Sequence, residues 1–100
     1  MPLSDQQAAH WPVVIVGAGA AGLYAACHLD SPALLIERGP EAGRKLLLTG
    51  GGRCNLTHES DVPGLLGHYR GNSRFLLSAF SRHDAHQVRT WFHQAGVPTV

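Results

Sequence analysis

The ten residues from Val13 to Gly22, VVIVGAGAAG, carry the strongest structural signal in this sequence. Four β-branched residues at 13–16 form a continuous apolar run, which is typical of a strand covered on both faces in a parallel sheet. A G-x-G-x-x-G pattern follows at once, and an alanine-rich stretch then extends to about Leu29. This order predicts a strand, a tight glycine turn and a helix that begins near Ala18.

A second apolar run covers Ala33–Ile36 and ends in the charged pair Glu37–Arg38. Strand, helix and strand within about 25 residues predict a βαβ unit with a right-handed crossover. A doubly wound parallel sheet has about five or six strands, whereas this sequence supplies two and the start of an extended segment at Val97–Val100. We therefore expect an α/β chain with a Rossmann-like βαβ domain that is incomplete, the N-terminal part of a doubly wound parallel sheet.

The rest of the chain predicts loops and short helices. Residues 39–72 hold eight of the twelve glycines, which indicates a functional loop region. Within this region, Arg44–Leu48 is compatible with either a helical turn or a strand. A short helix is expected after Asn72 or Ser73, and a longer one should run from a cap at Asp84 to a stop at Gly96.

Composition narrows the class of protein. Eight Lys and Arg against seven Asp and Glu leave a formal charge of +1, so we expect neither nucleic acid nor a membrane surface as a partner. No export signal and no apolar run long enough to span a bilayer is visible. Two cysteines without C-x-x-C spacing favour a reducing, cytoplasmic setting. The seven histidines do not have the spacing of a metal site, so we expect no bound metal. A small-molecule substrate is the expected partner, and the oligomeric state stays open.

Each glycine of the motif has an expected role. Gly17 permits the tight turn, Gly19 lets the backbone approach a pyrophosphate, and Gly22 lets the helix lie close to the sheet. Glu37 lies 20 residues after Gly17, the place from which a carboxylate accepts hydrogen bonds from the ribose hydroxyls of a dinucleotide. The carboxylate of Glu37 would repel the 2′-phosphate of NADP, and the adjacent cation Arg38 would reduce this repulsion. Glu37 therefore disfavours NADP only moderately.

A second motif, GRKLLLTGGGRCNLT, occupies residues 43–57. Three consecutive glycines allow the backbone to pass against a flat ring or a diphosphate. The three cations Arg44, Lys45 and Arg53 bring donors toward anionic oxygen and would stabilise an electron-rich reduced flavin.

Together, VVIVGAGAAGLYAA, LLIER and GRKLLLTGGGRCNLTH resemble the N-terminus of the BaiN-like bacterial NAD(P)/FAD-dependent oxidoreductases, also called the aminoacetone oxidase family. The resemblance runs from about Pro12 to Val100. It implies a Rossmann-type FAD domain interrupted by inserted domains, in proteins several times as long as this chain. We accordingly expect residues 1–11 to be a flexible N-terminal lead-in and residues 12–100 to be the N-terminal portion of an FAD/NAD(P)-binding domain.

The resemblance also implies a set of cofactor-binding residues. Glu37 would hold the adenosine ribose, and Arg38 would flank the adenine. The FAD diphosphate would lie against Gly17, Ala18, Gly19, Ala20, Ala21 and Gly22. The path toward the flavin would be lined by Arg44, Lys45, Gly51, Gly52, Arg53, Cys54 and Asn55. No catalytic residue is inherited, because those groups would lie beyond Val100.

The cysteines are expected to be packing residues. Redox-active cysteine pairs need a partner a few residues away, and residues 55–60 contain none, so Cys54 is interpreted as a buried residue beside the flavin. Cys27 lies in the apolar helix and is expected in the core.

The function expected from these observations is that of an FAD-dependent oxidoreductase, with NAD(P)H or a small substrate as hydride donor. A nucleotide-binding module without turnover is one alternative. An NAD-dependent dehydrogenase is a second, which the GGGRCN segment disfavours because a simple NAD domain needs no such loop.

Overall fold

The computed structural model describes residues 10–100, so most of the expected lead-in at 1–11 lies outside the described residues. The chain divides into two compact units, one ending at Asn55 and one running from Leu56 to Val100. Each unit is described by itself below. Among the described helices, none is long and apolar enough to cross a membrane.

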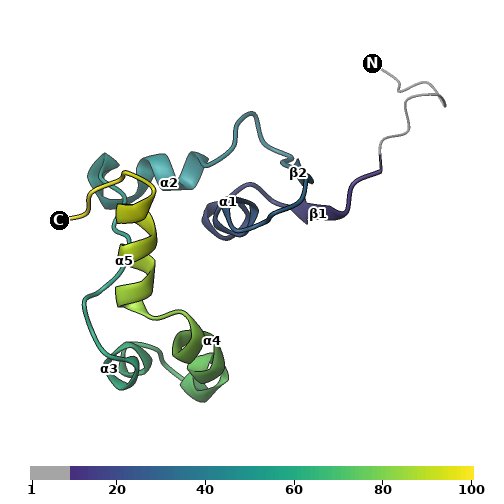
Figure 1. The fold of residues 1–100 in the computed structure, drawn as a ribbon. Coiled ribbons are helices and arrows are strands. Elements are labelled where there is room, and N and C mark those ends of the chain that lie inside the picture. Colours follow the sequence, from purple (N-terminus) through teal and green to yellow (C-terminus); the bar gives the residue numbers. More distant parts are fainter. Residues whose placement is uncertain (1–9) are drawn as a thin grey trace. The chain divides into compact units, whose positions relative to one another are not determined.

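The first unit is built on a βαβ element (Figure 1). Strands β1 (Val13–Val16) and β2 (Ala33–Ile36) pair in parallel, with Val13 beside Ala33 and Val16 beside Ile36. Helix α1 (Ala20–Cys27) connects the strands and contacts both of them. The predicted α/β, Rossmann-like architecture is confirmed.

Helix α1 is shorter at both ends than the predicted span from Ala18 to Leu29. At its start, the left-handed φ of Gly17 (+98°) keeps the chain in a turn, and the backbone N–H of Ala18 donates to a side chain rather than continuing a helix. At its end, the N–H of His28 bonds to the carbonyl of Ala25, which tightens the last turn before Asp30.

The sheet is covered on one face within this chain. Val13 and Ile15 are half-buried on the side of β1 where α1 packs, whereas Val14 and Val16 are 52% and 83% exposed. The expectation of a strand buried on both faces is therefore wrong for the described residues, which supply this sheet with a single helix.

Residues 39–55 are mostly turns around one short helix. The sequence of Arg44–Leu48 was compatible with a helical turn or a strand, and in the structure these residues form helix α2 (Arg44–Leu48). A 3-10 segment, η2 (Thr49–Gly52), follows it, with left-handed backbone at Gly50 (φ 58°) and Gly51 (φ 64°). Two neighbouring glycines make this reversal possible without steric strain.

The second unit is helical in its described residues. It contains α3 (Val62–Gly67), η3 (Ser73–Leu76), α4 (Leu77–Arg82) and α5 (Ala85–Gln94). The predicted cap at Asp84 is confirmed, because its carboxylate accepts from the N–H of Gln87 while the Gln87 side chain accepts from the N–H of Asp84. Helix α3 was not predicted, although Asp61 caps it and Pro63 stands in its first turn. The segment Val97–Val100 forms no strand.

Candidate functional site

The turn between β1 and α1 explains the spacing of its glycines. Gly17 has a φ of +98°, and its N–H donates to the carbonyl of Ile36 at 2.7 Å, which ties the turn to the end of β2. A Cβ added to Gly22 would overlap the carbonyl oxygen of Gly17, whereas a Cβ added to Gly19 would meet no atom within 4 Å. Gly22 is thus a packing glycine, and Gly19 faces open space.

The N-terminus of α1 is available to an anion. Gly19 is its N-cap residue, and no side chain hydrogen-bonds to this helix end. The first N–H groups of a helix need partners, and the positive end of the helix dipole favours a negative one. Because the space in front of Gly17 and Gly19 is open, the turn fits the approach of a diphosphate.

Glu37 connects the end of β2 to the glycine turn. Its carboxylate accepts from the N–H of Gly39 at 2.6 Å and from the N–H of Ala18 at 3.1 Å. The Gly39 bond first, and then the Ala18 bond, lower the pKa of Glu37. Desolvation opposes them, and the charge of Arg38 lowers the pKa by less than desolvation raises it. A carboxylate has about four lone-pair positions, so two backbone donors leave places for two ribose hydroxyls.

These bonds predict an acid-dependent loss of stability. A carboxyl whose pKa is lower in the folded chain stabilises the fold above its unfolded pKa, and this contribution is lost as pH falls through the folded pKa. We expect the thermal stability of the first unit to fall in this acid range, and Glu37→Gln to remove that part of the fall. Melting curves between neutral and acid pH measure it.

Glu41→Gln is the matched control, because Glu41 is an exposed glutamate of the same segment whose side chain makes no hydrogen bond to the described residues. If acid pH lowered the thermal stability of Glu37→Gln and of the unmodified protein by the same amount, the stabilising role of the bonds between Glu37 and the turn would be contradicted.

Gly43 anchors the second motif to the first. It is buried, and its N–H donates to the carbonyl of Ala18 at 2.7 Å. Its left-handed φ (+69°) and its closeness to Leu23 both favour glycine. Arg44 and Lys45 follow Gly43 directly and are exposed at the start of α2. Because Gly43 is bonded to the glycine turn, the chain carries these two cations only one and two residues beyond that bond. The sequence places Gly43 at the start of the second motif, but its spacing did not predict this bond to Ala18.

The loop after α2 is held by its own backbone. The N–H of Arg53 donates to the carbonyl of Gly50, and the N–H of Cys54 donates to the carbonyl of Thr49. Gly52 and Cys54 have left-handed φ values of 88° and 54°. In the described residues no hydrogen bond joins this loop to the glycine turn, so Gly51, Gly52, Arg53, Cys54 and Asn55 form a separate group at the far end of α2.

Both cysteines are exposed, contrary to expectation. Cys54 lies in the loop that follows α2, and Cys27 is the last residue of α1, a helix without a fully buried residue. Arg38 is likewise exposed, beside Glu37.

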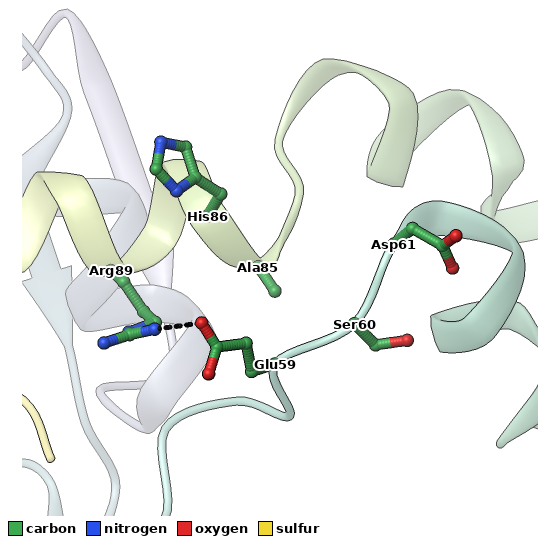
Figure 2. A pocket seen from close by; sticks show the side chains of 6 residues that line it. All are labelled: Glu59, Ser60, Asp61, Ala85, His86 and Arg89. Atoms are coloured by element: carbon green, nitrogen blue, oxygen red, sulfur yellow. Dashed lines mark hydrogen bonds and ion pairs between the residues drawn. The ribbon is translucent and has the colours of Figure 1, made fainter.

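The second unit has a small polar depression of about 240 Å³. Figure 2 shows Glu59 and Arg89 pointing toward each other, with His86 directed away from them. The Arg89 Nη1 atom lies 2.7 Å from Glu59 Oε1, so these two charges of the depression are paired with each other. Among the described residues, no group of three His, Cys, Asp or Glu side chains is arranged to hold a metal ion.

The βαβ unit, its glycine turn and the carboxylate at the end of β2 define a nucleotide-binding domain of the Rossmann class. The family model described as the HI0933-like protein Rossmann domain matches residues 11–100, and the chain belongs to that family.

Three curated proteins are similar to parts of the chain. The ribosomal RNA dihydrouridine synthase of Escherichia coli is 40% identical over 72 residues, 69% of this chain and 18% of that protein. The protein of the same name from Haemophilus influenzae is 39% identical over 74 residues, 70% of this chain and 18% of that protein. The 3-dehydro-bile acid delta(4,6)-reductase of Clostridium scindens is 41% identical over 51 residues, 46% of this chain and 12% of that protein. The chain therefore spans less than a fifth of the length of these relatives.

Proposed function

We propose that this chain is the FAD-binding part of a flavin-dependent oxidoreductase that transfers hydride between NAD(P)H or a substrate and FAD. The observation that carries this proposal is the uncapped glycine turn with Glu37 held beside it by the Ala18 N–H, in a chain of the HI0933-like family. FAD, when bound, would supply the acceptor and donor of hydride. Residues 12–100 would then be the N-terminal portion of an FAD/NAD(P)-binding domain.

The residues of the first unit divide the work of binding. Gly17–Gly22 would receive the diphosphate at the start of α1, and the free lone pairs of Glu37 would accept from the adenosine ribose. Arg38 would flank the adenine. Arg44 and Lys45 would face anionic oxygen, and Gly51–Asn55 would lie along the path to the flavin ring. The finer resemblance to the BaiN-like oxidoreductases belongs to this proposal.

The names of the relatives suggest the type of substrate. One name states that dihydrouridine is made in ribosomal RNA, and the other that a delta(4,6) bile acid is reduced. Both reactions add hydrogen to a ring double bond. We propose the same reaction type here: hydride adds to one carbon of the double bond, a proton adds to the other, and the nicotinamide donor is oxidised.

A small molecule and an RNA base are the two candidate substrates. The formal charge of +1 favours a small molecule, since eight Lys and Arg residues are nearly balanced by seven Asp and Glu residues. The two dihydrouridine synthases among the relatives favour a uridine in RNA. The two exposed free cysteines favour a reducing compartment, and we place the reaction in the cytoplasm.

Visible absorption of the purified protein, before and after denaturation releases bound cofactor, tests the proposal. We expect flavin bands that bleach when NAD(P)H is added without oxygen. Flavin that binds but is not reduced by NAD(P)H or by substrate would favour a binding module. A folded protein without flavin that binds NAD would favour the dehydrogenase alternative.

Glu37→Ala should weaken flavin retention by about tenfold, because the ribose hydroxyls lose a charged hydrogen-bond acceptor. Equilibrium dialysis against FAD measures this change. Glu41→Ala removes an exposed glutamate four residues away and should leave retention unchanged. Equal FAD affinity in the two variants would contradict the role given to Glu37.

A further inference from the structure

The last residues of the second unit fold back along helix α5. The helix ends in two turn bonds, from the N–H of Gly96 to the carbonyl of His93 at 3.0 Å and from the N–H of Val97 to the carbonyl of Phe92 at 2.8 Å. Gly96 has a left-handed φ of +83°, which completes this helix stop. The reversed chain brings Thr99 back beside α5, where it is half-buried, whereas the residues on either side of it are exposed.

Thr99 is bonded to two side chains of α5. Its N–H donates to Nε2 of His93 at 3.2 Å, and its Oγ1 lies 2.8 Å from the same nitrogen. The same oxygen accepts from Nε of Arg89 at 3.4 Å. Arg89 also bonds to Glu59 through its Nη1, so one guanidinium holds residues near the start and near the end of the second unit.

These bonds require a neutral imidazole at His93. A backbone N–H can only donate, so Nε2 offers its lone pair to Thr99 and carries no proton. The Thr99 hydroxyl, which accepts from Arg89, can donate its own hydrogen to the same nitrogen. Among the described residues, no carboxylate forms an ion pair with His93, because Glu59 is bonded to Arg89 and Asp84 caps the far end of α5. The returning residues 94–100 carry no titratable side chain.

We propose that His93 and Thr99 form a pH-sensitive latch, which holds residues 97–100 against α5 while His93 is neutral and releases them when it takes up a proton. Protonation places a hydrogen on Nε2, so the Thr99 N–H loses its acceptor and two donors face each other. It also adds a second positive charge beside Arg89. The ring of His93 is exposed, which gives protons direct access, and histidine changes its charge between about pH 5 and pH 8.

Release of the latch should leave the rest of the second unit in place. His93 lies in the last turn of α5, where a positive charge interacts favourably with the helix dipole, so protonation does not weaken the helix itself. Glutamate carboxylates stay ionised throughout the range in which histidines titrate, so Glu59 keeps its ion pair with Arg89. We therefore expect the segment that carries Thr99 to leave α5 alone. The latch lies wholly in the second unit and does not depend on the proposed flavin site.

The backbone amide signal of Thr99 tests the latch in purified protein labelled with ¹⁵N-threonine. The sequence has four threonines, and Thr99→Ser identifies the signal of Thr99 by its disappearance. Between about pH 8 and pH 5 we expect this signal to shift with a single midpoint. Its protection against hydrogen exchange, relative to the intrinsic exchange rate at each pH, should fall by about fivefold, as expected for the loss of one ordinary hydrogen bond.

His93→Gln is the discriminating variant. Glutamine places an acceptor oxygen near the position of Nε2 but takes up no proton in this range, so its Thr99 signal should not respond to pH. His86→Gln is the matched control, because His86 is an exposed histidine of the same helix whose side chain makes no hydrogen bond to the described residues. Its Thr99 signal should respond as in the unmodified protein. Circular dichroism checks that each variant is folded.

Two outcomes would overturn the latch. One is a Thr99 amide that keeps its position and its protection from about pH 8 to pH 5. The other is a pH response that persists in folded His93→Gln, because another group would then cause it. If His93→Gln does not fold, the imidazole ring signals of His93 in the unmodified protein decide: the latch requires them to share the midpoint of the Thr99 response, and a different midpoint refutes it.

Discussion

Gly22→Ala is expected to disrupt the βαβ unit and destabilise the first unit by at least about 3 kcal/mol, the upper end of the usual range for overpacking. The added methyl group would overlap the carbonyl oxygen of Gly17, which is backbone and has no rotamer to change. Relief requires α1 to move away from the turn, and this breaks its contacts with β1 and β2. Circular dichroism during denaturant unfolding measures the loss.

Gly67→Ala is the matched control for this prediction. Gly67 ends helix α3, and a Cβ built there meets no atom within 4 Å. We expect its stability to stay within about 1 kcal/mol of the unmodified protein, because alanine also restricts the unfolded chain. If Gly22→Ala unfolded at the same denaturant concentration as Gly67→Ala, the close packing of α1 on the Gly17 turn would be refuted.

Gly19→Val is expected to abolish FAD binding while the chain stays folded. Gly19 has an extended backbone (φ −85°, ψ −164°) that valine adopts readily, and nothing lies within 4 Å of an added Cβ. The branched side chain would occupy the open space in which the diphosphate approaches the N-terminus of α1. We expect affinity to fall by at least about a hundredfold, or roughly 2.7 kcal/mol.

Fluorescence titration with FAD measures the effect of Gly19→Val, with melting curves as the check on folding. Gly67→Val places the same side chain at an equally open glycine in the second unit and should bind FAD normally. Normal binding by a folded Gly19→Val variant would show that the diphosphate does not lie at this turn.

The βαβ unit was predictable because its signals are local. The β-branched run at 13–16 and the glycine after it mark both ends of β1, and the ladder with Ala33–Ile36 follows from two apolar runs of equal length. The limits of α1 were not predictable in the same way. Its start depends on a bond from the Ala18 N–H to Glu37, a residue 19 positions away. Helix α3 was missed because two of its six residues are glycine and one is proline.

The candidate site was predictable where spacing alone defines it. The three glycines and the acid at the end of β2 are recognised from their positions in sequence. The exposure of Cys27 and Cys54 was not predictable from the sequence, because burial depends on which elements pack over a residue rather than on its neighbours in sequence. The bond from Gly43 to Ala18 was not predictable for a related reason, since the two residues are 25 positions apart in the sequence.

The two-stranded sheet also has a consequence for work in solution. Within the described residues, β1 and β2 each pair along one side only, which leaves a row of backbone donors and acceptors beside the bare side chains of Val14 and Val16. Such an edge is a template on which a strand from another copy can add. Self-association at high concentration would thus compete with native pairing, so a dilution series should accompany every affinity or unfolding measurement on this chain.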